Sequence, residues 1–394
     1  MAWRCPTAST STTWRLRELG KSSASSPSLS NDREARLAMT QGRLGKVGGA
    51  FVAGVALLLV LNGQGFAQKK KWQPPTGNVK VTNVGTNAAA FLEIGVGARA
   101  VGMGSAFVAT ADDATAMYWN PAGIGWLSKI EATFTHASWF VGTNFDYAGF
   151  AVPVGRFAVG ASVTYFGFGE QPVRVIGMEN GTGEYYSAGD VALAVALALN
   201  LTDRFSFGFN GKYIEQKIWH CKAHGAALDV GFLYQTLLDG LTVGMSVSNF
   251  GTEMRMSGRD LLNAIDPDPT HEGVDRINVN YATDSFPLPV IMRFGVAYKH
   301  RLGNLGDLRV ATDVLHPSNS TESLNLGVEY LFGGLLELRA GYQNLFEKDS
   351  VNGLTYGAGI RYATRFGLEF RLDYAYADWG FLRNTQRVTA TLAF

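Results

Sequence analysis

Residues 366–376 read FGLEFRLDYAY, and apolar and charged side chains alternate along the whole stretch. Successive side chains of a β-strand point to opposite faces of the sheet. One face of this stretch is therefore apolar throughout, while the other carries Glu369, Arg371 and Asp373. This period-two alternation predicts a β-strand with different surroundings on its two sides.

The same alternation recurs from about residue 129 to the end of the chain, and it predicts fourteen strands. Most of the predicted strands are long enough for a tilted strand to cross a bilayer. The predicted strands are 129–140, 144–154, 156–167, 188–200, 204–217, 225–236, 241–250, 288–300, 307–315, 322–331, 335–343, 353–363, 366–376 and 384–394.

The lengths of the connections favour a barrel over a soluble sandwich. Connections after even-numbered strands are tight, whereas most of those after odd-numbered strands are longer, such as 168–187, 218–224 and 251–287. An outer-membrane barrel sorts its connections in this way, with short periplasmic turns and longer external loops. A water-soluble sandwich with one polar face is the alternative, but nothing in that fold requires short connections at one end and long connections at the other.

In a closed barrel the apolar faces meet lipid and the polar faces meet the lumen. Closure is required because every backbone N–H and C=O in hydrocarbon must be paired. We expect the charged side chains of neighbouring strands to neutralise one another in the interior, and aromatic residues near strand ends to form interfacial girdles. The predicted lumen charges are Glu329, Glu337, Arg339, Arg361, Glu369, Arg371 and Asp373; the predicted girdle residues are Trp139, Phe140, Tyr165, Phe166, Tyr330, Tyr342, Tyr374 and Tyr376.

Composition excludes several other classes of protein. The chain has 394 residues, 47 of them glycine, with 46% hydrophobic and 17% charged residues and a net charge of +1. This is too apolar for a disordered chain and lacks the basic excess of a nucleic-acid binder. No apolar stretch reaches the roughly 18–20 residues that a spanning helix needs.

The two ends of the chain carry signals for export and assembly. Residues 39–67 combine a basic start, an apolar core and a small residue at the end, which predicts a secretory signal peptide; a membrane anchor is the alternative. Residues 1–38 are interpreted as a non-native extension, with an organellar transit peptide as the alternative. The last residue, Phe394, is aromatic and is interpreted as an outer-membrane assembly signal. We therefore expect an all-β transmembrane barrel at 129–394, preceded by a small hatch segment at 68–128.

The hatch segment contains two motifs, GARAVGMGSAFVA at 97–109 and DDATAMYWNPAG at 112–123. With the long alternating region behind them, these motifs resemble the PorV/PorQ family of outer-membrane proteins, which is related to the FadL-type transporters. The residues that carry the resemblance are Gly97, Arg99, Gly102, Met103, Gly104, Asp112, Asp113, Asn120, Pro121, Ala122 and Gly123.

The resemblance implies a fourteen-stranded barrel with an N-terminal hatch, in the outer membrane of a Gram-negative bacterium. It further implies an accessory or partner-binding role in type IX-like protein secretion or cell-surface attachment, with protein partners held by the long external loops. The alternative is a FadL-like channel for hydrophobic small molecules. Besides the membrane lipid, we expect the barrel assembly machinery to be a partner. We expect no nucleic acid, no cofactor, no metal and no enzymatic activity.

Overall fold

The computed structural model describes residues 84–394 except 268–269, 271–275, 304–305 and 348–349. The predicted extension at 1–38 and signal peptide at 39–67 lie outside the described residues. Within the described part of the chain, no helix is long and apolar enough to cross a membrane.

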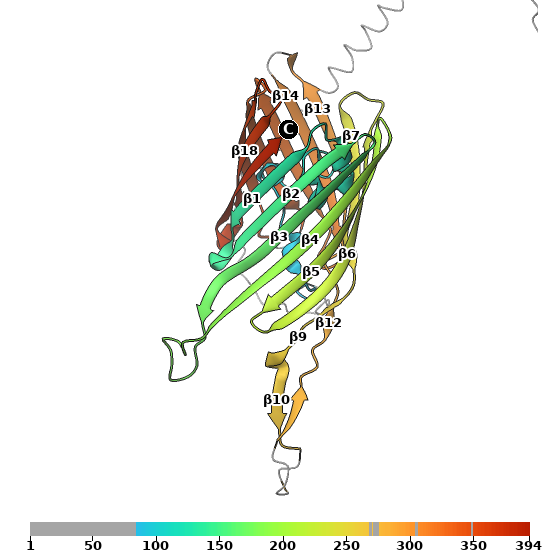
Figure 1. Cartoon of the computed structure of the whole chain (residues 1–394). Helices are drawn as coiled ribbons and strands as arrows, with labels where there is room; N and C mark the ends of the chain where they lie inside the picture. Colours follow the sequence, from blue (N-terminus) through green and yellow to red (C-terminus); the bar gives the residue numbers. More distant parts are fainter. Residues whose placement is uncertain (1–83, 268–269, 271–275, 304–305, 348–349) are drawn as a thin grey trace, which may run out of the picture. The chain divides into compact units, whose positions relative to one another are not determined.

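Fourteen long antiparallel strands form a closed barrel (Figure 1). Each strand pairs with its neighbours in the chain, β7 pairs with β13, and β19 closes the barrel by pairing with β1. The strands are β1 (Glu131–Ser138), β2 (Asn144–Val154), β3 (Phe157–Pro172), β4 (Tyr185–Thr202), β5 (Phe205–Ile218), β6 (Cys221–Gln235), β7 (Leu241–Gly251), β13 (Ile291–Arg301), β14 (Asp307–Pro317), β15 (Ser323–Phe332), β16 (Leu336–Leu345), β17 (Leu354–Ala363), β18 (Glu369–Asp378) and β19 (Asn384–Ala393).

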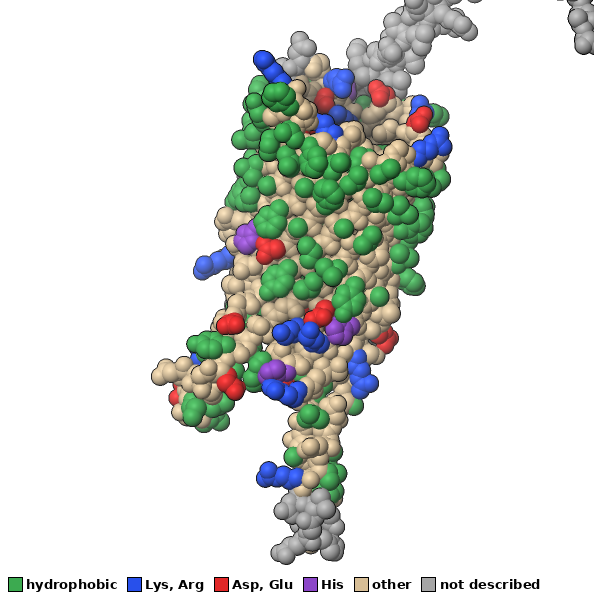
Figure 2. All heavy atoms as spheres, viewed as in Figure 1, with side chains coloured by type: hydrophobic (Ala, Val, Ile, Leu, Met, Phe, Trp, Pro, Cys, Tyr) green, Lys and Arg blue, Asp and Glu red, His purple; other side chains and the backbone are tan. Residues whose placement is uncertain are grey.

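The predicted orientation of the two faces is confirmed. In β18, Leu372 is 56% exposed on the outer wall, whereas its neighbour Asp373 is 2% exposed and faces the interior. Figure 2 shows the outer wall covered by apolar side chains over much of its height. Two predicted girdle residues face the interior instead. Trp139 lies against the guanidinium of the inward-facing Arg387. Phe166 is partly buried and packs against the interior core. It lies on the opposite face from Tyr165, as alternation requires.

The longest connections, 173–184, 252–290 and 346–353, all lie at one end of the barrel, whereas the other four connections at that end are as short as those at the opposite end. The turn end, which also contains Phe394, carries connections of two to five residues at 155–156, 203–204, 236–240, 302–306, 333–335 and 364–368. The loop end carries 139–143, 173–184, 219–220, 252–290, 318–322, 346–353 and 379–383. Phe394 is half exposed on the outer wall and its backbone pairs with that of Ile130. Its role in assembly stays a prediction.

Two predicted loops are wrong in extent because the strands beside them are longer than expected. β3 and β4 extend past the predicted loop 168–187 and leave only 173–184. The predicted loop 218–224 is a two-residue turn in which Trp219 takes a φ of 53° and β6 begins at Cys221. Lys222 and His224 point outward from β6, so the polar residues that suggested a loop belong to a strand.

The longest connection projects from the loop end as a small hairpin of its own (Figure 1). Its distal part is built by β10 and β11, which pair with each other, and β9 pairs with the barrel strand β6. The elements of this connection are β8 (Met254–Arg255), β9 (Ser257–Gly258), η4 (Arg259–Leu261), β10 (Leu262–Ile265), β11 (Ile277–Asn280) and β12 (Ser285–Phe286).

Residues 90–126 lie inside the barrel and contribute most of its buried core. Short helical turns alternate with extended segments, and the largest fully buried side chains include Phe107, Met103 and Met117. The turns are η1 (Ala90–Glu93), α2 (Ala98–Gly102), α3 (Ala116–Trp119) and η2 (Pro121–Trp126); two further turns, η3 (Phe140–Gly142) and η6 (Gly380–Leu382), lie at the loop end. We call residues 84–128 the interior segment.

The lipid-facing role of the outer wall predicts the effect of a charge placed there. Leu372→Arg is expected to lower the free energy of unfolding by about 2–4 kcal/mol, because an arginine on the lipid face near the midplane is poorly solvated. Denaturant unfolding of the protein in lipid vesicles measures the change. Ile176→Arg, at a fully exposed position of the 173–184 loop, is the control. An equal loss in both variants would contradict a lipid-facing wall at Leu372.

Candidate functional site

Arg99 fastens the interior segment to the barrel wall. This arginine lies in α2 and is 5% exposed. Its guanidinium donates two hydrogen bonds to the Glu329 carboxylate of β15, with N···O distances of 2.8 and 3.0 Å. It also contacts Asp112 and, at 3.0 Å, Asp113 of its own segment. A bidentate pair of this kind fixes both the position and the orientation of the helical turn.

The predicted lumen charges extend this pair into a network along the inner wall. Arg339 bonds to Glu329 at 2.8 Å and to Asp373 at 2.7 Å, and it also pairs with Glu337. β16 and β18 each carry charges of both signs, and each predicted lumen charge has a partner of opposite sign. The remaining pairs are Arg361–Glu337, Arg361–Glu369, Arg371–Glu369, Arg371–Asp113, Arg309–Asp112 and Arg309–Glu329.

Two arginines of the network keep a carboxyl group of the interior segment, that of Asp112, ionised. Burial by itself would raise the pKa of the Asp112 carboxyl, but the guanidinium groups of Arg99 and Arg309 hold it well below its usual range. Asp112 is therefore ionised at neutral pH and contributes a fixed negative charge between two arginines.

The Asn-Pro-Ala element is held by the side chain of Asn120, which is fully buried. Its Nδ2 donates to the carbonyl oxygens of Val108 at 3.0 Å and Phe232 at 2.9 Å, and its Oδ1 accepts from the N–H of Ala122 at 3.2 Å. Asn120 thus caps η2 and ties it to β6. Pro121 occupies the first position of η2, where a missing N–H costs nothing.

Glycines allow the backbone of the interior segment to touch the wall. Gly104 has a φ of +64°, and a Cβ there would overlap the backbone of Leu326 and Tyr342. Its N–H donates to Thr355 Oγ1 at 3.0 Å. Gly102 packs against Gly357 in the same way. The remaining motif residues, Gly97, Met103, Ala122 and Gly123, are all buried. Met103 also touches the wall at Gly327 and Gly341, whereas Ala122 touches it at Gly208 of β5.

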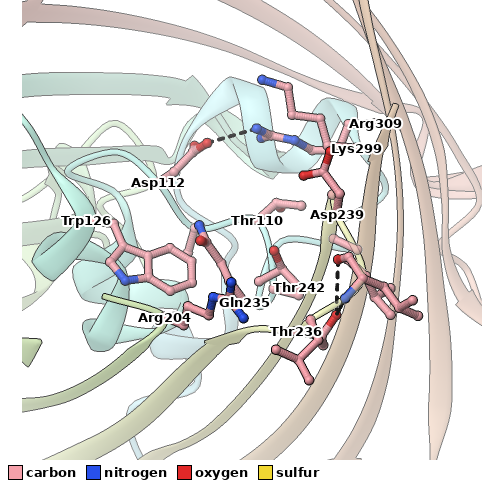
Figure 3. Close-up of a pocket in the computed structure, with 17 residues that line it drawn as sticks. Thr110, Asp112, Trp126, Arg204, Gln235, Thr236, Asp239, Thr242, Lys299 and Arg309 are labelled. Carbon is pink, nitrogen blue, oxygen red and sulfur yellow. Dashed lines mark hydrogen bonds and ion pairs between the residues drawn. The ribbon is translucent and has the colours of Figure 1, made fainter. Parts of the chain in front are cut away.

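Two of the cavities inside the described barrel lie one toward each end, and these two share no lining residue. The turn-end cavity has a volume of about 530 Å³ and is lined by Asp112, Arg309 and Lys299 with the turn 236–240. Figure 3 shows Trp126 and Arg204 on the side opposite Arg309. The loop-end cavity has a volume of about 340 Å³ and is lined by aromatic, amide and arginine side chains.

Sequence reasoning missed several inward-facing charges. Lys212 and Asp229 form a buried ion pair at 2.7 Å beside Asn210 and Asn249. Arg293 and Arg387 are buried near the loop end. Each lies on the inward side of its strand, so strand parity could have revealed them. Met292 and Phe294 flank Arg293, and Leu228 and Val230 flank Asp229, so the apolar face is marked there as it is in β18.

Breaking the Arg99 contacts is expected to destabilise the protein strongly. Arg99→Met leaves the carboxylates of Asp112, Asp113 and Glu329 with fewer cations, and removal of one partner of a buried ion pair costs about 3–5 kcal/mol. Unfolding by guanidinium chloride in detergent, followed by tryptophan fluorescence, measures the loss. Arg301→Met removes the exposed partner of Asp307 and is expected to cost less than about 1 kcal/mol. Similar losses in the two variants would contradict an anchoring role for Arg99.

Residues 78–231 match the sequence model of a family described as type IX secretion system protein PorV. The match covers both motifs of the interior segment and the strands from β1 into β6. No curated protein matches the chain.

Several solved structures show a distant likeness. They include the toluene transporter TbuX of Ralstonia pickettii, with 12% identity, a TM-score of 0.47 and coverage of 76% of this chain and 97% of that chain. A Pseudomonas aeruginosa FadL homologue has 14% identity, a TM-score of 0.47 and coverage of 76% and 98%. The CymD monoaromatic hydrocarbon channel has 11% identity, a TM-score of 0.49 and coverage of 76% and 97%. Likenesses this distant say nothing about what this chain binds or carries.

The closed barrel, its apolar outer wall and the family match agree with one another. The protein is an outer-membrane β-barrel protein that is similar, over residues 78–231, to the type IX secretion system protein PorV.

Proposed function

We propose that the protein is an accessory, partner-binding component of type IX-like protein secretion or cell-surface attachment. The loop end would face the outside of the cell, because short turns face the periplasm in outer-membrane barrels. The PorV match over residues 78–231 supports the link to secretion. The observation that carries partner binding is the exposed apolar surface on the two projecting connections.

The projecting connections expose apolar side chains beyond the barrel wall. At the tip of the 173–184 connection, Ile176 is fully exposed, and Val175 and Met178 are each at least half exposed. In the longest connection Leu262, Ile265, Ile277 and Tyr281 are all exposed. Apolar side chains that cluster on an aqueous surface mark contact sites for other proteins, and loops longer than a turn requires tend to carry function.

The filled interior supports a scaffold better than an open pore. The interior segment occupies the lumen, and buried ion pairs such as Arg99–Glu329 hold it to the wall. Moving it aside would separate several of these pairs in a region shielded from water, which is costly. The interior segment would therefore act as a fixed plug.

A channel for hydrophobic small molecules is the second candidate. The observation that favours it is the aromatic lining of the loop-end cavity, to which Trp119, Trp139 and Trp379 all contribute. Transport would require the interior segment to open a path from this cavity to the turn-end cavity. Uptake of apolar substrates by a deletion strain, with and without the gene restored, tests this function separately from partner binding.

Removal of the distal hairpin tests the proposed role directly. The backbone N–H of Tyr281 donates to the carbonyl of Leu261 at 2.9 Å, so residues 262–280 can be replaced by a short glycine linker without stretching the chain. We expect the shortened protein to assemble in the outer membrane but to lose most of its co-purifying protein partner, because the apolar contact surface is gone.

The point variant Ile176→Asp tests the second connection, and Leu237→Asp is its matched control. Leu237 is 81% exposed but lies at the turn end. Partner recovery, measured by pull-down from native membranes and mass spectrometry, is expected to fall for the first variant and to stay unchanged for the second. Full partner recovery by both the shortened protein and Ile176→Asp would refute the proposal.

A further inference from the structure

The turn-end cavity opens among the short turns of the barrel. Its volume of about 530 Å³ falls in the range of cavities that bind small molecules. The interior segment contributes Asp112 and Trp126 to it, and β6, β7, β13 and β14 contribute the surrounding wall. Arg204 and Asp239 lie in turns that border the cavity, and both are exposed. A molecule on the turn-end side of the membrane therefore has direct access to it.

Polar side chains predominate in the lining of this cavity. Figure 3 shows Thr110, Gln235 and Thr242 around the space between Trp126 and Arg309. With the charged residues, the lining offers hydroxyl, amide, carboxylate, ammonium and guanidinium groups. Among the described residues that line the cavity, Trp126 is the only aromatic one. An apolar ligand would take water from these groups and give them no partner, which is unfavourable.

Several of these polar groups have no partner within the described protein. No hydrogen bond or ion pair to another described residue is made by the side chains of Trp126, Arg204, Gln235, Asp239 and Thr242. The backbone N–H of Gln235 nevertheless donates to the carbonyl of Arg204 at 2.8 Å, which holds these two residues in place. In the middle of the lumen, by contrast, polar side chains bond to one another. The turn-end cavity thus presents positioned donors and acceptors that are available to a ligand.

The charges on the cavity have both signs. The cations are Arg204, Lys299 and Arg309, and the anions are Asp112 and Asp239. Arg309 bonds to Asp112 at 3.0 Å, and Lys299 pairs with Asp307, outside the lining, at 2.8 Å. Neither a simple anion nor a simple cation matches such a lining, because each would meet charges of its own sign. A ligand whose groups both donate and accept hydrogen bonds matches it better.

We propose that the turn-end cavity binds a sugar unit of a glycan. A sugar hydroxyl both donates and accepts, so it can bond to the guanidinium of Arg204, the amide of Gln235 and the carboxylate of Asp239 alike. The bonds to the two charged groups are the stronger ones. The C–H groups on one face of a pyranose ring form an apolar surface, and this surface packs against the indole ring of Trp126.

Two sources offer this chemistry on the turn-end side of the membrane. In the orientation proposed above, the turn end faces the periplasm, where the strands of the cell wall consist of N-acetylated sugars. A free oligosaccharide without acetamido groups is the other source. The site does not depend on the proposed partner role of the projecting connections, which lie at the opposite end of the barrel (Figure 1).

Two disaccharides with the same linkage test the site and separate the sources. Diacetylchitobiose carries acetamido groups where cellobiose carries hydroxyls. Binding to the purified full chain is measured by calorimetry in a detergent without a sugar headgroup, so that the detergent does not compete. We expect at least one disaccharide to bind. Tighter binding of diacetylchitobiose identifies the cell-wall strand as the source, and equal or tighter binding of cellobiose identifies a glycan without acetamido groups.

Variants of the lining assign the site. Trp126→Ala and Arg204→Gln are each expected to weaken disaccharide binding about tenfold, because the first loses the ring contact and the second a hydrogen bond from a charged group. Arg156→Gln is the matched control. Arg156 is likewise an exposed arginine in a turn-end connection and its carbonyl accepts from the N–H of Asn200 at 2.8 Å, but it does not line the cavity. Its replacement is expected to leave binding unchanged.

Arg204→Gln keeps the test decisive if Trp126→Ala does not fold, because the Arg204 side chain is exposed and bonds to no other described residue. The proposal is overturned when neither disaccharide binds, when binding survives both replacements, or when Arg156→Gln weakens it as much as Arg204→Gln does. None of these results bears on the projecting connections, so failure of the sugar site is distinguishable from failure of the proposed function.

Discussion

The pairing of β19 with β1 is the constraint on which the rest of the structure depends. Hydrocarbon offers no water to an unpaired backbone N–H or C=O, so a sheet can cross it only when its last strand meets its first. Eight residue pairs, from Glu131–Ala393 to Ser138–Gln386, close the barrel. Once the sheet is closed, every side chain that alternates inward must be accommodated in an enclosed lumen. The fold therefore requires that these inward-facing side chains be packed and neutralised inside the barrel.

Two kinds of contact fill the middle of the lumen. Near α2, acidic and basic side chains from the five strands β14 to β18 and the interior segment neutralise one another, with Arg99 and Arg339 at the centre. Beside these charges, glycines such as Gly104 and Gly341 let backbone touch backbone. Close contact and charge pairing together exclude water from the middle of the barrel, which strengthens each ion pair. This rigid middle separates the two cavities.

Much of the fold could be predicted from sequence because lipid and lumen impose opposite polarity on alternate residues. The prediction of β2 matches its observed bounds, and in β18 the apolar and charged faces are as expected. The predictions fail where that contrast ends. Near Lys222 and His224 the outer wall is polar, so a strand was interpreted as a loop. The projecting hairpin was predicted only as a long loop, since it lies outside the alternating region.

The interior contacts could not be predicted from strand parity, because pairing partners depend on how the strands are staggered around the barrel. Strand parity places Arg339, Arg371 and Arg387 alike on the inward sides of their strands, although only Arg339 and Arg371 were predicted as lumen charges. The structure separates them: Arg339 and Arg371 meet carboxylates, whereas Arg387 meets only the face of Trp139 among the described residues. The difference follows from position. Residue 387 lies at the level of the loop end, above the acidic residues that the interior segment brings to the middle of the lumen. A charge placed there lacks the ion pairs of the middle of the lumen, and the contact with the Trp139 ring offsets only part of the cost of burying it.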